Sequence, residues 1–318
     1  MNGIFLFLIL NFWQFDRINM GIYNAGLVWK YTKAKGGYFE FKVREYKKEV
    51  REWVYNTFED VWEEEITGSS SKMFAKINRF NLLAGLGKGG VLSIGYYLEE
   101  DFSYYWHLVK YSNAIKEYEE EEEGKGGIYS YGITWGYGIN WLGFGAGIDM
   151  VNIKNIYNSF VNDSIKTSFD KNEMKYRGNL AISFTYKDIF QISNIFKTKI
   201  KDELPWKNLI LIKYSPPSRS FLSIYLYGIF DEEKNKEFGT VFEHFFLGRI
   251  LLSGGASLKY LKDEDLWIID YNFNTGYSSK GKFIKAGFIY SGYEFKDAEN
   301  KRNIIQKIDY ILGFGYYF

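Results

Sequence analysis

The feature that most constrains this chain is a period-two alternation of residue types, repeated in segments of about ten residues almost to the end. Between residues 129 and 139, one face carries Tyr, Ile and Trp, and the other carries Ser, Thr and Gly. After a turn near Asn140, apolar residues in 142–150 alternate mainly with glycine. This pattern predicts antiparallel strands with one apolar face, and the small residues suit a face crowded inside a curved barrel.

Composition agrees with this interpretation. The 318 residues include 3 prolines, which suits long ladders because an internal proline removes a ladder donor. No stretch approaches the roughly 18 apolar residues of a spanning helix, which argues against a helical membrane protein. A barrel passes undetected by that test, because its lumen-facing residues are polar or small. The absence of cysteine excludes disulfides and thiolate metal sites, and the net charge of +1 gives no field toward nucleic acid.

We therefore predict an all-β fold, a transmembrane antiparallel up-and-down barrel of about 14 strands (range about 12 to 16), with residues 1–318 as a single domain. Short turns near Asn140 and Lys187 contrast with long polar connections at 111–127, 153–175 and 296–306. Short periplasmic turns opposite longer extracellular loops are typical of outer-membrane barrels. A soluble antiparallel β protein, which would bury the aromatic face in a core, is the main structural alternative.

Two N-terminal segments depart from the alternation. Residues 1–12 contain a short apolar run without a preceding basic residue or a cleavage site, which leaves two interpretations: a partial signal peptide, or a first strand. Residues 47–66 carry apolar residues at helical spacing among Glu and Lys, which predicts a short helix in an N-terminal loop. That helix would pack on the barrel rim, plug the lumen or rest at the membrane interface. The residues at helical spacing are Val50, Trp53, Val54, Phe58, Val61 and Trp62.

Six polar residues alternate with apolar neighbours on predicted strands. Because a charge on the lipid face costs roughly 2–4 kcal/mol near the midplane, we expect these side chains to face the lumen. There they could set the selectivity for permeant molecules, or form an ion-pair network that closes the pore. The six candidate lumen-facing residues are Glu40, Lys42, Arg44, Asp149, Asn179 and Asp270.

Several motifs have simpler explanations. Residues 85–90 match G-x-G-x-x-G and 276–282 imitate a P-loop, but strands follow both, so each is predicted to be a hairpin turn. The run Glu119 to Glu123 predicts a solvated loop, with cation attraction at a pore mouth as the alternative. His107 and His244 stand in no catalytic motif, so we expect no enzyme, no catalytic residue and no cofactor. A barrel enzyme would require one of them beside a serine or an acid near the rim.

The last ten residues form an alternating strand whose apolar face ends in a terminal phenylalanine. This end resembles the C-terminal signal read by the outer-membrane assembly machinery: Gly313 lies five residues before Phe318, and Tyr316 supplies a second aromatic. Ile311 departs from the polar residue usually found two positions before that glycine. The resemblance implies that the barrel-assembly machinery is a partner and that these three residues form its signal.

Residues 128–318 also resemble the superfamily of long-chain fatty-acid transporter-like (FadL-like) barrels, including the PorV/PorQ-type proteins. The likeness lies in paired strands such as 128–152, in a proline-marked connection at 214–217, in segments 242–244, 254–260 and 269–273, and in the terminal strand. The N-terminal third lacks the Asn-Pro-rich opening that usually forms part of the hatch.

This resemblance implies a location in a bacterial outer membrane, in contact with its lipid. It also implies a passive channel or transporter for small or hydrophobic solutes, with a small hydrophobic ligand. The alternative is a secretion- or surface-attachment-associated barrel that binds a secreted protein through its long loops. No nucleic-acid partner is expected from the balanced charge.

Overall fold

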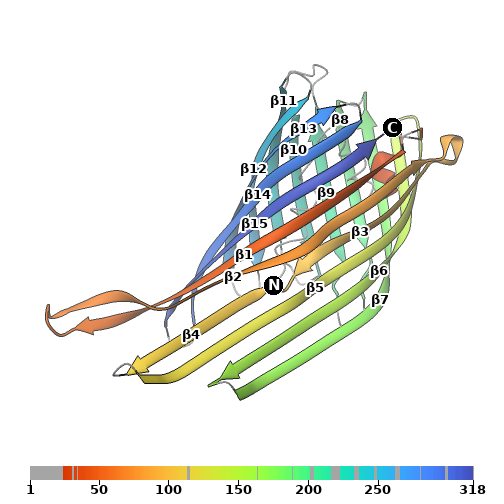
Figure 1. Ribbon diagram of the computed structural model, residues 1–318. Helices are drawn as coiled ribbons and strands as arrows, with labels where there is room; N and C mark the ends of the chain where they lie inside the picture. The colour runs from red at the N-terminus through yellow and green to blue at the C-terminus, as the bar shows by residue number, and fades with distance from the viewer. Residues whose placement is uncertain are drawn as a thin grey trace.

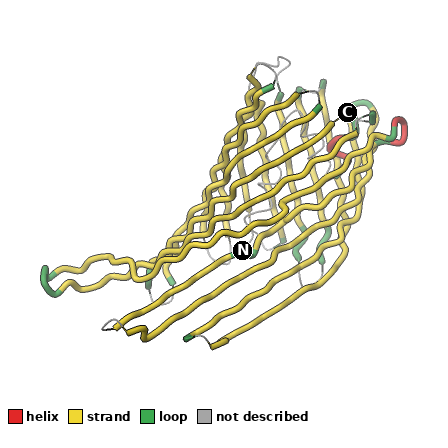
Figure 2. Tube along the Cα trace, in the orientation of Figure 1, coloured by secondary structure: helices red, strands yellow, loops and turns green. Residues whose placement is uncertain are grey.

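The computed structural model describes residues 24–30, 32–33, 35–112, 115–162, 164–187, 189–200, 204–215, 223–232, 236–246, 249–261, 266–279, 281–297 and 300–317. These residues form one antiparallel sheet that closes on itself (Figures 1 and 2). Its strands are β1 (Lys35–Asn56), β2 (Val61–Gly85), β3 (Val91–Asp101), β4 (Tyr104–Ser112), β5 (Ile115–Ile139), β6 (Leu142–Val161), β7 (Ser164–Tyr186), β8 (Phe190–Lys197), β9 (Lys207–Tyr214), β10 (Ser223–Asp231), β11 (Lys236–Phe246), β12 (Ile250–Leu261), β13 (Leu266–Ser279), β14 (Lys282–Lys296) and β15 (Arg302–Tyr317).

The barrel closes at two places. The last strand, β15, pairs with the first strand, β1. On the other side of β2, the short strand β3 pairs with both β2 and β5, which completes the ring of strands. β3 and β4 lie end to end along β5, so the 15 strands occupy 14 positions around the barrel. The predicted up-and-down barrel of about 14 strands is therefore confirmed.

Alternation places large apolar side chains on the outside. Phe39 is 37% exposed and Phe314 is 44% exposed, whereas their chain neighbours Glu40 and Gly313 face inward and are buried. The same division holds on the described residues of the other long strands. An apolar exterior around a polar or small-residue interior is what a barrel needs in lipid, because water is available on the inside alone.

The two ends of the barrel differ. The β1–β2, β4–β5 and β6–β7 hairpins extend from one end, and the C-terminus lies at the other (Figure 1). At the C-terminal end the turns are tight: Asn140 adopts a φ of 55°, as a two-residue hairpin turn requires. The connections predicted as long loops at 111–127, 153–175 and 296–306 are instead strands for most of their length. They read as loops because polar residues occupy both faces once a strand passes beyond the apolar band.

The helix predicted at 47–66 is wrong. β1 continues to Asn56, and β2 begins at Val61 and returns beside it. The Asn56 side chain accepts the backbone N–H groups of Phe58 and Glu59, and Asp60 has a φ of 57°, so this segment turns tightly. The helical spacing arose because a ribbon with both faces exposed has no core to enforce alternation, so Trp53 and Val54 can both be apolar.

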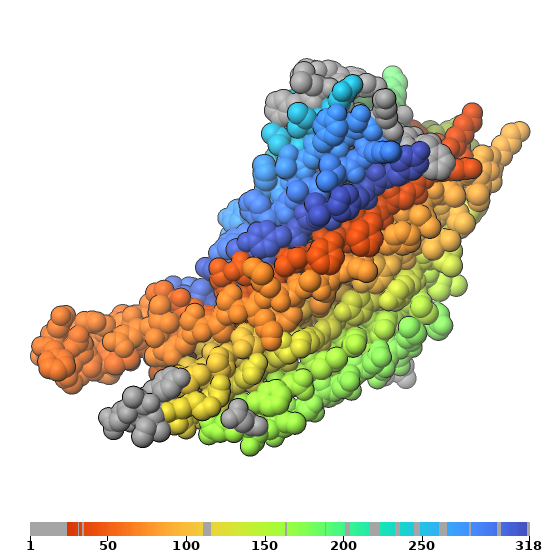
Figure 3. Space-filling view, in the orientation of Figure 1, coloured from red at the N-terminus to blue at the C-terminus, as the bar shows by residue number. Residues whose placement is uncertain are grey.

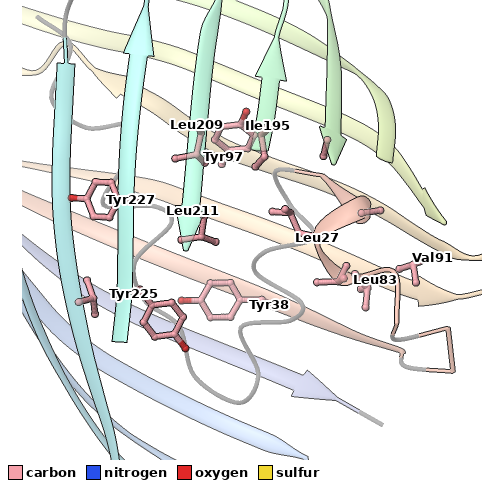
Figure 4. Close-up of a cluster of buried hydrophobic side chains, with 14 of the residues drawn as sticks. Leu27, Tyr38, Leu83, Val91, Tyr97, Ile195, Leu209, Leu211, Tyr225 and Tyr227 are labelled. Atoms are coloured by element: carbon pink, nitrogen blue, oxygen red, sulfur yellow. The ribbon is translucent and has the colours of Figure 1, made fainter. Parts of the chain in front are cut away.

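One helical turn, η1 (Ala25–Val28), lies inside the barrel near the β5–β6 wall. Apolar side chains from η1 and from strands on several sides of the lumen meet around it (Figure 4). Among the described residues, no helix is long and apolar enough to cross a membrane. Residues 1–12, for which a partial signal peptide is one interpretation, and Phe318 lie outside the described residues.

Candidate functional site

The glycine face of β5 and β6 holds the N-terminal turn η1. The backbone N–H of Ala25 donates to Thr134 Oγ1 at 2.9 Å, and Asn24 Nδ2 donates to Asn179 Oδ1 at 3.0 Å. A Cβ added at Gly145 would overlap the Asn24 side chain, and one added at Gly143 would overlap the Trp29 ring. The glycines therefore permit close approach of an internal segment along this wall, which narrows the lumen there.

Beside η1 lies a buried group that we call the arginine cluster. Its members, from β3, β6, β7 and β8, are Glu99, Asp149, Arg177, Asn179 and Lys197. Arg177 pairs with Glu99, and Lys197 Nζ lies 3.0 Å from Asp149 Oδ2 and 3.6 Å from Glu99 Oε1. Asn179 donates to Asp149 at 3.3 Å and connects the cluster to η1 through Asn24. Two cations thus neutralise two carboxylates inside the barrel.

A second buried group, the aspartate cluster, brings together Lys42, Arg44, Lys76, Asp101 and Asp309. Arg44 donates two hydrogen bonds to the Asp309 carboxylate, from Nε at 2.6 Å and from Nη2 at 2.7 Å. Lys42 Nζ lies 2.7 Å from Asp101 Oδ2, and Lys76 Nζ lies 2.5 Å from Asp101 Oδ1. The side chains reach the lumen from β1, β2, β3 and β15, so the cluster spans the closure of the barrel.

A third group surrounds Glu40. Its carboxylate accepts from Tyr38 and Asn78, and it lies 3.0 Å from both Arg79 Nε and Lys285 Nζ. The structure thus places five of the six predicted lumen residues within three buried clusters. Asp270, the sixth, is also buried and lies on β13 opposite Ser257 and Ser291 of the neighbouring strands.

Sequence reasoning missed the acidic end of β3. The ladder between β3 and β5 shifts register between Leu98 and Glu100, which makes Glu99 the extra residue of a β-bulge. Glu99, Glu100 and Asp101 are all buried, and two of them anchor the arginine and aspartate clusters. The available signal was three consecutive acids at the end of an alternating strand, since a strand that keeps its alternation cannot point all three inward.

A seam interrupts the wall next to this bulge. The β2–β3 ladder ends at Arg79, and in the described chain residues 61–78 of β2 have a ladder with β1 but none with β4. Side chains bridge the seam instead: Ser70 Oγ donates to the Tyr105 carbonyl at 3.2 Å, and Lys72 Nζ lies 2.5 Å from Glu123 Oε1. Trp106 packs against Gly68, where a Cβ would not fit. Such a seam can part without breaking a β-ladder.

Aromatic side chains line the lumen beside the seam. Tyr46, Phe74 and Ile305 are buried together, with Tyr104, Tyr105 and Tyr293 packed against them. Lys307 Nζ lies 5.2 Å from the centre of the Tyr293 ring. The exposed Met73 and Ile77 place the inner part of the seam at the level of the outer apolar band. The aromatic cluster in the lumen therefore lies beside the part of β2 that has no ladder with β4 in the described chain.

The glutamate run and His107 lie at the long-hairpin end of the barrel, and His244 lies on the outer wall. The Glu119 to Glu123 run lies on β5 and is half-buried, so it is part of a strand and not a solvated loop. His107 Nε2 lies 2.8 Å from Glu119 Oε1, which meets the acid contact required of a barrel enzyme but supplies no nucleophile. Hydrogen bonds from Lys116 and then from His107 lower the pKa of Glu119. His244, on β11, is half-buried.

The two described residues of the proposed assembly signal, Gly313 and Tyr316, have different surroundings. Tyr316 is exposed on the outer face, whereas Gly313 faces inward beneath the Tyr38 hydroxyl, with no room for a Cβ. We predict that Gly313→Val lowers the yield of folded barrel, at a cost of about 1–3 kcal/mol from overpacking. The yield is measured as the heat-modifiable band on a denaturing gel.

Adding Tyr38→Ala to Gly313→Val distinguishes packing from signalling. If Gly313 is required because the Tyr38 ring crosses it, the double variant recovers folded yield. A double variant as defective as Gly313→Val would assign the glycine to recognition by the assembly machinery.

A closed barrel with an apolar outside, a polar inside and one set of long hairpins has the architecture of a transmembrane β-barrel. The seam between β2 and β4 and the internal turn η1 are therefore the candidate functional site. No family model and no curated protein matches the sequence.

The fold does match solved structures. The P. putida toluene transporter TodX has a TM-score of 0.63 at 11% identity, covering 95% of this chain and 94% of its own. The Ralstonia pickettii toluene transporter TbuX gives 0.59 at 9% identity, covering 89% and 90%. The CymD monoaromatic hydrocarbon channel gives 0.55 at 10% identity, covering 94% and 92%. At these identities the likeness shows the fold alone.

Proposed function

We propose that the protein is a bacterial outer-membrane channel for small or hydrophobic solutes, which leave the lumen through the seam between β2 and β4. The single observation that carries the proposal is the absence of a ladder between these neighbouring strands in the described chain, beside an aromatic lumen wall. The toluene and monoaromatic hydrocarbon carriers of the same fold support the substrate class. The FadL-like resemblance agrees with it, and the PorV/PorQ likeness stays a prediction.

The chemistry of the passage follows from its lining. An apolar solute entering from the long-hairpin end meets the cluster around Tyr46 and Phe74, which can bind it without a charged partner. Further travel along the barrel axis would bring it among the buried ion pairs, where an apolar solute gains nothing. A route into the bilayer through the part of the seam beside Met73 and Ile77, where the outer surface is apolar, is therefore favoured for apolar solutes by the hydrophobic effect.

Closing the seam should block this transfer. The chain has no cysteine, so Ser70→Cys with Tyr105→Cys can be joined by a short thiol-reactive crosslinker without side reactions. We expect cross-linking to lower uptake of toluene by cells carrying the barrel about tenfold, with reduction restoring it when a cleavable linker is used. The matched control is Thr240→Cys with Ala256→Cys, which are directly opposed on β11 and β12, where a ladder already joins the strands.

Two adverse outcomes differ in meaning. Uptake that persists after the Ser70–Tyr105 cross-link, yet depends on the barrel, would overturn exit through the seam and leave a channel along the axis. Uptake equal in cells with and without the barrel would overturn the channel itself. A secretion or attachment scaffold is the second candidate function, favoured by the exposed hairpin that β1 and β2 form beyond the barrel.

A further inference from the structure

The β1–β2 hairpin projects well beyond the rest of the barrel as a separate arm (Figures 1 and 3). The β1–β15 ladder ends at the pair Arg51 and Arg302, and residues 61–78 of β2 have no ladder on their other side in the described chain. We call residues 52–66 the finger. It is a two-stranded ribbon with two free backbone edges, and such a ribbon is marginally stable without a third strand.

One face of the finger is aromatic. Tyr55 and Trp62 are cross-strand partners with ring centres 5.4 Å apart, and Trp53 lies next to them on the same face. Trp53 is 61% exposed, Trp62 is 64% exposed, and Phe58 in the turn is 99% exposed. Exposed aromatic groups of this size are typical of interaction sites.

A charged collar separates the aromatic face from the apolar band of the barrel. Below Trp53, the outward side chains of β1 are Glu45, Lys47, Glu49 and Arg51. On β2, Ser69 and Ser71 lie opposite Glu49 and Lys47, and they separate the exposed Ile66 on the finger side from the exposed Met73 on the barrel side. Trp53 lies ten residues past Val43, the last apolar outward residue of the band, which is about 33 Å of strand. The aromatic face is therefore not a continuation of the lipid-facing surface.

The negative charge of the finger favours a positively charged binding partner. Residues 52–65 hold six carboxylates and no Lys, Arg or His. At the base of the finger, Lys301 in the β14–β15 turn lies 3.1 Å from Glu52, and Arg302, the first residue of β15, lies 3.2 Å from Glu64. The carboxylates nearer the tip repel anionic lipid headgroups and attract cations, which also bind the faces of Trp and Tyr rings. Those carboxylates belong to Glu59, Asp60, Glu63 and Glu65.

We propose that the finger is a docking surface for an extended polypeptide segment bearing lysine or arginine. The segment adds as a third strand to a free edge of the ribbon, places its apolar side chains on Trp53 and Trp62, and sets its cations against the carboxylates. This role is independent of the channel, because the finger lies outside the lumen.

The test uses the detergent-purified full chain and fluorescent peptides of alternating Lys and Val or alternating Glu and Val. Fluorescence anisotropy should show the Lys peptide binding at least about tenfold more tightly than the Glu peptide, and more weakly as salt rises. Trp53→Ser with Trp62→Ser should weaken Lys-peptide binding by about tenfold or more. Glu59→Gln, Glu63→Gln and Glu65→Gln together should weaken it and flatten its salt dependence.

A second acidic arm supplies the control. Glu117→Gln, Glu120→Gln and Glu121→Gln on β5 remove as many carboxylates from a hairpin, residues 104–124, whose described side chains include no exposed aromatic, and should leave binding unchanged. Each variant must show the heat-modifiable band of a closed barrel. Binding insensitive to the finger variants overturns the proposal. So does finger-dependent binding to anionic vesicles in place of the peptide, or finger-dependent self-association in sedimentation, since these assign the finger to a membrane or to a second copy.

Discussion

Replacing Arg177 by methionine should lower the free energy of unfolding by about 3–5 kcal/mol, because it leaves two buried carboxylates with one cation. In the native barrel Arg177 pairs with Glu99 and lies 3.5 Å from Asp149, and all three side chains are fully buried. After the change, Lys197 would face both carboxylates alone. The measurement is unfolding by urea in lipid vesicles, followed by tryptophan fluorescence.

Lys171→Met is the matched control on the same strand. Lys171 Nζ lies 3.5 Å from Glu173 Oε1, but both side chains are about one-third exposed, so its loss should cost less than about 1 kcal/mol. Adding Glu99→Gln to Arg177→Met should recover part of the stability, because the uncompensated charge disappears. Equal losses for Arg177→Met and Lys171→Met would show that the arginine cluster does not hold the barrel together.

The alternation of β5, β6 and β13 was sufficient to predict the barrel and which face of each strand is polar. This worked because lipid on one side and a wet, crowded lumen on the other impose opposite demands on successive residues. It also indicated that Glu40, Arg44 and Asp149 face the lumen, because a charged residue between lipid-facing apolar neighbours points to the opposite face of its strand. Their partners were not predictable, because the pairing of Arg44 with Asp309 depends on closing the first strand against the last.

Prediction failed where that constraint is absent. Beyond the apolar band both faces of a strand meet water, so the finger lost its alternation and imitated a helix at Trp53 and Val54. At Glu99 a bulge breaks the period, and the three acids resemble an ordinary solvated run. A glycine-rich lumen face, as on β6, is compatible with open space for a ligand and also with tight internal packing. At Gly143 and Gly145 the structure shows tight packing, against Trp29 and Asn24 respectively.

The glycines of β6 also control how closely η1 packs against the lumen wall. Gly145→Val would place a side chain in the space that Asn24 occupies, so we expect η1 to leave the glycine face of β5 and β6. Overpacking of about 1–3 kcal/mol would shift the docked population about 5- to 150-fold. Because η1 narrows the lumen, undocking should raise the conductance of single barrels in planar bilayers.

Two further variants show whether the rise comes from η1. Asn24→Ala removes the bond to Asn179 without touching the barrel wall, so it should raise conductance in the same direction even if Gly145→Val folds poorly. Gly254→Val is the control for a strand glycine, because a Cβ there meets nothing closer than the Asn272 carbonyl at 3.6 Å. It should leave conductance unchanged. If Asn24→Ala and Gly145→Val both fold and conduct like the native protein, η1 does not gate the lumen, and the resistance to ion flow must lie in the buried ion-pair clusters.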